Sequence, residues 1–561
     1  MIRRSAAGPS APTRKVIRSY APIAVVAAVF LLMAGVVHPI DRPVERELAA
    51  GQDSGAIAGG VPADAAPAAG GGTGASGAGG TVPTTGTGGG GVGAQTSGGG
   101  GGAGAGVQRC PDRAQQVPGD PYSPPCTTFS GDNGGATFQG VTGDTIVVAA
   151  RELDSPTAGE LFAEISGQHV ITSPEAVRNT ILAYAEYFST HFDFYGRKIK
   201  IVFYKGQGNG SSEILGGGKE AALADSVKVD REIKAFADIS AITLPYADAL
   251  SQQGIVNFGA PYPSREWFAR RRPFAWSNFP DGTNVVESAA TALVARQGSG
   301  TADYAGGGLK GKKRVYGLVA PENEEYQESV SRYIDLLGPA GIKPAVNLKY
   351  KLDINSMPNQ ASNIIAQLKD AGVTTVLCGC DPVMLALGLT PKANEQNYQP
   401  EWLTAGLAFV DQDIVSQLID QQQWSRAFGI AYNAESEALG GSFSYHAYKL
   451  IRPSDEPAFG YQELYYQLYM LAIGIQMAGP NLTPQTFEAG MFAYPGGQGP
   501  RGRWHFAPGD WTTTDDFREI WWDPNRVSSQ NNRQGAWVTM FGGARRTRDG
   551  MPAGPAPYFE G

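Results

Sequence analysis

The sequence predicts an α/β protein with two doubly wound, Rossmann-like lobes joined by a hinge, preceded by one N-terminal transmembrane helix and a disordered Gly-rich linker. Three observations support this prediction. An uncharged apolar run lies near the N-terminus, a long glycine-rich stretch follows it, and from Gly143 onward short β-branched runs alternate with amphipathic helical stretches. Such alternation is typical of parallel α/β units, and here it occurs twice in succession.

The apolar run comprises residues 21–37 and holds no charged side chain. Its length lies at the short end of the range for a membrane span, about 17 to 25 residues, and exceeds most signal-peptide cores. The residues before it include five basic side chains, Arg3, Arg4, Arg14, Lys15 and Arg18. By the positive-inside rule, residues 1–20 are then a cytoplasmic basic tail, and residues 21–40 are a transmembrane anchor or signal helix. No clear small-x-small cleavage site follows, so retention is favoured over a cleaved signal peptide, which would leave a secreted protein.

Residues 41–107 are predicted to be a disordered linker. From Gly51 to Val107 the chain consists almost wholly of Gly, Ala, Ser, Thr and Pro. That composition cannot bury enough apolar surface to offset the entropy lost on ordering. The linker would hold the folded part about 40 Å from its anchor, as expected for a flexible Gly-rich coil.

The first lobe is predicted from alternating strands and helices. Ser173 and Pro174 form an N-cap and a first-turn proline for a helix that runs to about His191. The other predicted elements are strands at 144–150, 198–204 and 254–259 and helices at 227–236 and 283–296. A late apolar helix at 461–477 is interrupted by several glutamines and a glutamate, so we expect it to be buried in this lobe and not to span a membrane.

The second lobe repeats the plan. Its predicted elements are strands at 314–319, 343–350 and 373–377, a helix stopped by Gly338 and Pro339, and a helix at 361–370. We assign residues 108–540 to the two-lobed domain. Lobe 1 takes about 140–280 plus 433–500, lobe 2 takes about 281–432 plus 501–525, and residues 541–561 form a loose C-terminal tail.

Composition and motifs argue against several functions. The formal net charge of −8 is opposite to that of most nucleic-acid binders. The five histidines are scattered, and no Gly-x-Ser-x-Gly elbow occurs. Residues 306–313 (GGGLKGKK) lack the Ser or Thr of a phosphate-binding loop and precede a strand where such a loop would follow one. We therefore expect no enzyme activity, no metal and no cofactor.

Several segments in the right order resemble the branched-chain amino-acid-binding (Leu/Ile/Val-binding) family of ABC importers. They include EAVRNTILAYAEYF after the first strand, LSQQGIVNFGAP near the middle and VYGLVAPENEEYQESVSRYIDLLGPAGI in the second half. The resemblance implies a type I periplasmic substrate-binding protein. Such a protein captures an amino acid, amide or related small molecule between two closing lobes and delivers it to ABC permease subunits. The alternative is a membrane-tethered extracellular sensory module of the same fold.

The resemblance also implies where a ligand lies, because the family holds it with loops at the strand ends of both lobes. These positions correspond to Glu152, Ser155, Thr243, Tyr246 and Tyr262 in the first lobe, and Tyr326, Cys380 and Asp381 in the second. Where members that bind amino acids place serines and threonines, this chain has Ile242, Pro261 and Pro263. A less polar ligand that stacks on tyrosines is therefore plausible.

The four cysteines fall into two close pairs. Cys110 and Cys126 bracket a Pro-rich loop and are predicted to form a disulfide outside the cell, with two free thiols as the alternative. Cys378 and Cys380 follow a buried strand, where two buried thiols and a Cys-x-Cys disulfide are equally compatible with the sequence.

Overall fold

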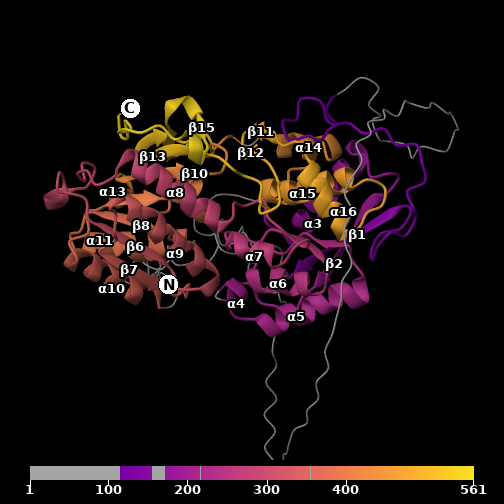
Figure 1. Cartoon of the computed structure of the whole chain (residues 1–561), viewed down its shortest axis with the longest axis horizontal. Coiled ribbons are helices and arrows are strands. Elements are labelled where there is room, and N and C mark those ends of the chain that lie inside the picture. The colour runs from indigo at the N-terminus through magenta and orange to yellow at the C-terminus, as the bar shows by residue number, and fades with distance from the viewer. Residues whose placement is uncertain (1–113, 154–170, 215, 354–355, 439, 561) are drawn as a thin grey trace, which may run out of the picture. The chain divides into compact units, whose positions relative to one another are not determined.

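The computed structural model describes residues 114–153, 171–214, 216–353, 356–438 and 440–560 (Figure 1). The predicted basic tail, membrane segment and linker lie outside the described residues, as do Cys110 and Ser155. Within the described ranges, no helix combines the length and the apolar character needed to cross a membrane.

The first lobe is built on a sheet of five parallel strands. Their spatial order is β2 (Lys198–Lys205), β1 (Thr145–Glu152), β3 (Ala237–Asp238), β4 (Val256–Phe258) and β5 (Ala275–Trp276). Because β2 and β3 flank β1 on opposite sides, the sheet is doubly wound with its switch point beside β1. Four apolar residues of β1, Ile146, Val148, Ala149 and Ala150, are buried, as its run of valines and alanines predicts.

Eight helices accompany this sheet among the described residues. They are α3 (Pro174–His191), α4 (Gly210–Ile214), α5 (Lys219–Lys228), α6 (Leu244–Gln252), α7 (Arg265–Ala269), α14 (Phe443–Ile451), α15 (Tyr461–Ala478) and α16 (Pro484–Ala493). The predicted start of α3 is confirmed, because the Ser173 side chain accepts a hydrogen bond from the Ala176 backbone N–H at 3.2 Å. Helix α15 is confirmed as a core helix, with Tyr465 and Tyr469 packed against Phe188 of α3.

The second lobe contains an eight-stranded sheet. Its order is β14 (Gln534–Thr539), β13 (Phe517–Val527), β10 (Ala427–Ala431), β9 (Glu401–Thr404), β8 (Thr375–Cys378), β6 (Tyr316–Pro321) and β7 (Val346–Tyr350), with β15 (Arg545–Arg546) also paired to β13. The strands from β7 to β10 are parallel and repeat the order of the first lobe, whereas β13 pairs antiparallel to β10. The switch point of this sheet lies beside β6.

Six α-helices belong to this lobe in the part of the chain that is described. They are α8 (Gly282–Arg296), α9 (Glu324–Leu337), α10 (Met357–Asp370), α11 (Thr390–Glu395), α12 (Asp413–Ser416) and α13 (Gln421–Trp424). Pairs of apolar positions three and four residues apart direct α9 and α10 onto the sheet, with Ile364, Ile365 and Leu368 of α10 buried as predicted.

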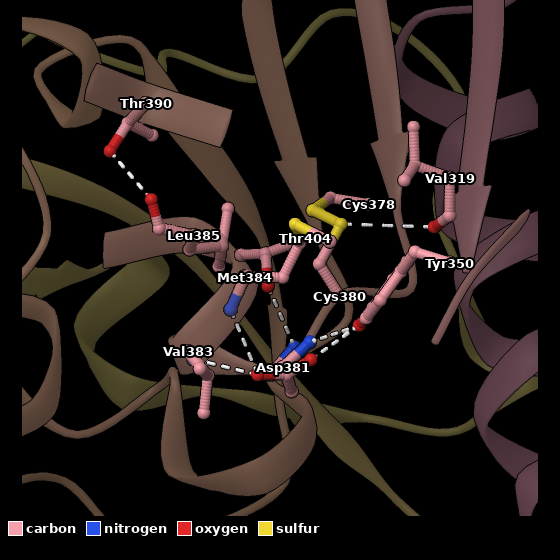
Figure 2. Close-up of a disulfide and its surroundings, with 11 residues drawn as sticks. Val319, Tyr350, Cys378, Cys380, Asp381, Val383, Met384, Leu385, Thr390 and Thr404 are labelled. Atoms are coloured by element: carbon pink, nitrogen blue, oxygen red, sulfur yellow. Dashed lines mark hydrogen bonds between the residues drawn. A yellow bond between two sulfur atoms is a disulfide. The ribbon is translucent and has the colours of Figure 1, made fainter. Parts of the chain in front are cut away.

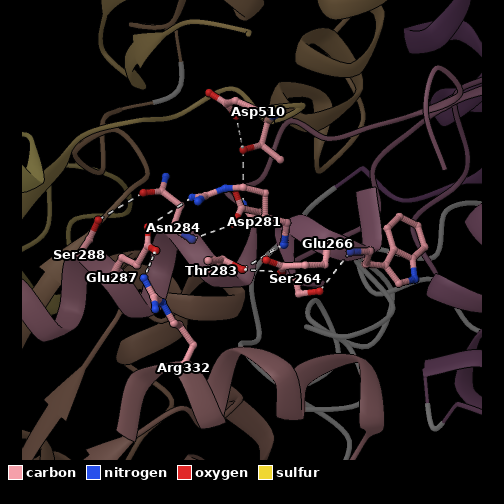
Figure 3. A network of polar contacts seen from close by, with 12 residues as sticks. Ser264, Glu266, Asp281, Thr283, Asn284, Glu287, Ser288, Arg332 and Asp510 are labelled. Atoms are coloured by element: carbon pink, nitrogen blue, oxygen red, sulfur yellow. Dashed lines mark hydrogen bonds and ion pairs between the residues drawn. The ribbon is translucent and has the colours of Figure 1, made fainter. Parts of the chain in front are cut away.

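Three segments connect the lobes among the described residues: 277–281, 432–438 with 440–442, and 505–516. The first and third run side by side, since Ser277 N donates to Trp511 O at 3.1 Å and Thr513 Oγ1 donates to Asn278 O at 3.1 Å. At the end of the first segment, Asp281 caps α8 by accepting a hydrogen bond from Asn284 N at 2.7 Å (Figure 3). These paired crossings connect the two lobes, and a hinge motion about them stays a prediction.

Two local predictions differ from the structure. The helix expected at 227–236 starts earlier, at Lys219, and ends in a π-helical turn at Ile233. The C-terminal segment, expected to be loose, packs on the second lobe: Tyr558 is 3% exposed, its ring lies 4.9 Å from that of Phe428, and β15 pairs with β13. A few aromatic side chains suffice to dock this Gly- and Pro-rich segment, because each buries a large apolar area.

Candidate ligand-binding site

A cavity of about 130 Å³ lies at the carboxyl ends of the second lobe's strands. Strands β6, β8 and β9 form its floor, α8 and α9 form its walls, and Pro261 and Tyr262 close it from the first lobe. Because ligands of doubly wound sheets bind beyond the carboxyl ends of the strands at the switch point, this is the expected place for a site. Both lobes therefore contribute to one cavity.

The lining of this cavity is almost wholly apolar. Among its described lining residues, Asp381 is the only side chain that carries a charge, and none is Lys, Arg or His. The aliphatic and aromatic part consists of Pro261, Tyr262, Val285, Val286, Ala289, Leu318, Ala320, Pro321, Tyr326, Val330, Tyr333, Leu352, Leu377, Leu403, Ala405, Leu407 and Ala408. Such a surface favours an apolar solute, because apolar contact is what it offers.

A fully buried polar side-chain atom in this lining has no hydrogen-bond partner. Ser329 of α9 is 5% exposed, and its Oγ makes no hydrogen bond. Ser329 stands three residues after Tyr326 and four before Tyr333, so helical spacing brings all three to the cavity. A buried hydroxyl without a partner is costly and is rare in proteins. Ser329 was not predicted from the sequence, although its helical spacing from Tyr326 and Tyr333 was a signal that could have identified it.

Asp381 lies at the edge of the cavity and is itself well satisfied (Figure 2). Its carboxylate accepts hydrogen bonds from the backbone N–H groups of Val383 at 2.7 Å and Met384 at 3.0 Å, and from the Tyr350 hydroxyl at 2.5 Å. Burial raises the pKa of Asp381 to about 6, because the charged form is disfavoured away from water, although these hydrogen bonds act in the opposite direction. The carboxylate thus orders the turn after β8.

Cys378 and Cys380 form a disulfide beside Asp381, with their Cα atoms 4.9 Å apart (Figure 2). Of the two states that the sequence allows, the structure has the disulfide. Both cysteines line the cavity. Cys126 also has a disulfide partner, and its predicted partner, Cys110, lies outside the described residues, so that pairing stays a prediction.

Tyr262 joins the lobes at the cavity. Its backbone has a φ of 60°, which non-glycine residues adopt infrequently, and its hydroxyl accepts a hydrogen bond from the Ala408 N–H of the second lobe at 3.1 Å. Burial raises the pKa of the Tyr262 hydroxyl. Tyr326 lines both this cavity and a smaller one of about 20 Å³, where it meets Thr243. The structure therefore brings Tyr262, Tyr326, Cys380 and Asp381 together, with Thr243 in the adjoining space.

The other predicted residues of the first lobe belong to its interior. Arg151 is buried against Glu213 at 2.7 Å and Asp225 at 3.2 Å, and its guanidinium lies 3.5 Å from the centre of the Tyr246 ring. The Tyr246 hydroxyl donates to Asp238 at 2.7 Å, and Thr243 donates to Glu213. This network occupies the carboxyl end of β1, where a polar ligand group would otherwise be held.

Glu152 has a partner of its own, since it forms an ion pair with Arg178 of α3. Neither Glu152 nor Tyr246 lines any of the three cavities described in this subsection. Whether any of the predicted residues binds a ligand stays a prediction.

A third opening of about 340 Å³ lies farther out between the lobes, lined by α5, α6, α7 and α9. It is polar, but its arginines are already paired: Arg271 lies 2.6 Å from Asp248, and Arg270 lies 3.5 Å from Glu328. Such internally matched charges are typical of a solvated interlobe surface.

The hinge holds a close pair of carboxyl groups. Burial raises the pKa of both Asp510 and Asp515; the negative charge of Asp281 raises the pKa of Asp510 further, and that of Asp510 raises the pKa of Asp515 further. One ligand atom each from His505, Asp510 and Asp515 lies within 4.8 Å of the others, in a loop whose five-residue spacings gave no sign of it in the sequence. A proton shared by the two carboxyls accounts for their closeness without an ion.

Residues 164–521, well over half of the chain, match the periplasmic binding protein family. The chain therefore belongs to this family, as a type I substrate-binding protein of the Leu/Ile/Val-binding kind. The resemblance found in the sequence is confirmed.

Solved structures agree on the fold. A solute-binding protein of an ABC transporter from R. palustris, in complex with 4-hydroxybenzoate, is 11% identical with a TM-score of 0.50, and the match covers 73% of this chain and 98% of that one. A Leu-, Ile-, Val-, Thr- and Ala-binding protein from Brucella ovis is 13% identical with a TM-score of 0.50 and the same coverage. No curated protein matches the sequence significantly.

Proposed function

We propose that this protein captures a small solute in the cavity between its lobes and delivers it to the permease of an ABC importer. The observation that carries the proposal is the cavity itself. It lies at the switch point of the second sheet, both lobes line it, and the lobes are joined by three segments that can act as a hinge.

Membership of the family supports the binding role. The ligands of similar proteins, 4-hydroxybenzoate in one and several amino acids in the other, support capture of small molecules. The folded part is proposed to act outside the cytoplasm, held by the helix at residues 21–40. Support for the anchor comes from the uncharged run at 21–37 and the basic residues before it.

A thermal-shift screen of the full-length chain against amino acids, amides, aromatic acids, alcohols and sugars tests the binding role. A solute that binds only the folded state stabilises it by about 2.7 kcal/mol at a hundred times its Kd. We expect a dose-dependent rise of the unfolding midpoint with one chemical class. If no class raises the midpoint, the solute-binding function is wrong.

Delivery and anchoring are tested in cells. Deletion of the chain is expected to abolish uptake of the solute that the screen identifies, and re-expression restores it. Unchanged uptake would favour the sensory alternative. After a carbonate wash, the chain is expected to stay in the membrane fraction, whereas a cleaved signal peptide would release it.

A further inference from the structure

The cavity that we assign to the solute offers no cationic partner for an anionic group. Among its described lining residues no side chain is cationic, and the one charged group is the carboxylate of Asp381. The nearby cation of the first lobe, Arg151, is buried between Glu213 and Asp225. A carboxylate ligand would therefore lose its hydration and meet a like charge, and both effects oppose binding.

The cavity also disfavours binding of a cationic group. The only counter-charge is Asp381, whose two oxygens already accept three hydrogen bonds from Val383, Met384 and Tyr350. That carboxylate is also largely buried in the turn that it orders. An ammonium group would have to compete with those contacts, so the geometry favours a solute without charge.

The hydroxyl of Ser329 is a buried polar group of this lining that makes no hydrogen bond. It lies beside Gly282, where an added Cβ would stand 2.6 Å from Ser329 Oγ. A hydroxyl can donate and accept, so it can pair with an alcohol, a phenol or a carbonyl. Such a pairing would remove the cost of the orphaned group.

The volume of the cavity indicates the size of the apolar group that it can enclose. At about 130 Å³ it is close to the volume, about 150 Å³, of an engineered apolar cavity in another protein that stays dry and binds benzene. One ring or a short branched chain fills such a space.

We propose that the cavity binds a small, uncharged and largely apolar solute that carries one hydrogen-bonding group, and that Ser329 binds this group. The inference rests on the proposed function, because it takes this cavity to be the solute site. Such a solute differs from the ligands of the two similar proteins, which are a carboxylate and amino acids.

The test is calorimetric titration of the full-length chain with five probes: benzyl alcohol, toluene, benzoate, benzylamine and leucine. The first four share one ring and differ in the polar group. We expect benzyl alcohol to bind at least about tenfold more tightly than benzoate, benzylamine or leucine. Tighter binding of any charged probe than of benzyl alcohol would overturn the inference while leaving the solute-binding function intact. If none of the five binds, the proposed solute class is wrong, whereas the solute-binding function is decided separately by the thermal-shift screen.

The Ser329→Ala variant isolates the hydroxyl. We expect this variant to bind benzyl alcohol about five- to tenfold more weakly and to change the affinity for toluene by less than about twofold. The unfolding midpoint of the free protein should stay level or rise, because an unpaired buried group is removed. The matched control is Ser288→Ala on α8, since Ser288 is equally buried, lies outside the cavity lining and is paired with Asn284 at 3.4 Å. That control variant should bind both probes with unchanged affinity. If Ser329→Ala lowers the affinity for toluene as much as the affinity for benzyl alcohol, the hydroxyl does not bind the polar group.

Discussion

Replacement of Gly282 by alanine tests how tightly the two lobes meet at the cavity. Gly282 is the first residue of α8, and a Cβ at this position would stand 2.4 Å from the backbone oxygen of Tyr262 and 2.6 Å from Ser329 Oγ. Atoms at such distances repel strongly, so the Tyr262 loop must move by at least about 0.6 Å to reach even 3 Å. That loop cannot move freely, because Gly282 N donates to Pro263 O at 2.8 Å and Tyr262 is hydrogen-bonded to Ala408.

Two effects oppose each other in this variant. Alanine favours the helix over glycine by up to about 1 kcal/mol. Overpacking costs about 1 to 3 kcal/mol when the clashing atoms are backbone and cannot swing away. We therefore expect Gly282→Ala to lower the free energy of unfolding by about 1 to 2 kcal/mol. We also expect it to lower the affinity of the probe that binds in the cavity.

The assay is urea denaturation followed by circular dichroism, with Gly338→Ala as the control. Gly338 follows α9 with a φ of −54°, and nothing stands within 4 Å of an added Cβ. The control should gain about 0.4 to 1 kcal/mol through the unfolded state. If Gly282→Ala is as stable as Gly338→Ala, the two lobes are not in the close contact described here.

Three further predictions concern the buried charges and the cysteines. Arg151→Ala should lower the free energy of unfolding by about 3 to 5 kcal/mol in a urea titration, because it leaves two carboxylates buried without a cation. Arg178→Ala, at a half-exposed ion pair, should lower it by less than about 1 kcal/mol in the same titration. Equal decreases in the two variants would contradict the buried network. The folded state holds the Asp381 proton more tightly than the unfolded chain does, because the pKa of Asp381 is raised to about 6. The free energy of unfolding of the wild type should therefore fall relative to that of Asp381→Asn by up to about 3 kcal/mol as pH rises from about 4 to about 6, and then stay level. Parallel stability curves for the two proteins would exclude the raised pKa. Peptide mapping without reductant should link Cys110 to Cys126, and alkylation of either residue in the unreduced protein would disprove that disulfide.

The architecture was predictable because it depends on local patterns. Alternating apolar runs and helical spacing predicted β1, α3, β2, α8 and β6 close to their observed bounds. These elements bury a continuous apolar face, which leaves a strong periodic signal in the chain. The two-residue strands β3 and β5 left no such signal, because their placement is decided by pairing with β1 and β4.

The candidate site was only partly predictable, for a related reason. Strand ends and family resemblance located Tyr262, Tyr326, Cys380 and Asp381 near one another, since the carboxyl ends of parallel strands converge. Glu152 and Tyr246 also follow or flank strand ends, yet Arg178 and Arg151 lie against them. Whether a polar side chain faces a ligand or an internal partner depends on residues distant in sequence.

The sequence by itself determined the two-lobed α/β plan, the family and the order of elements, because hydrophobic periodicity and turn residues act over a few residues. The tertiary structure alone decided which polar groups are satisfied. It paired Arg151 with carboxylates from α4 and α5, joined Cys378 to Cys380, and left Ser329 unpaired in an apolar cavity. Hydrogen-bond satisfaction is a property of packed neighbours, and packing brings together residues that are far apart along the chain.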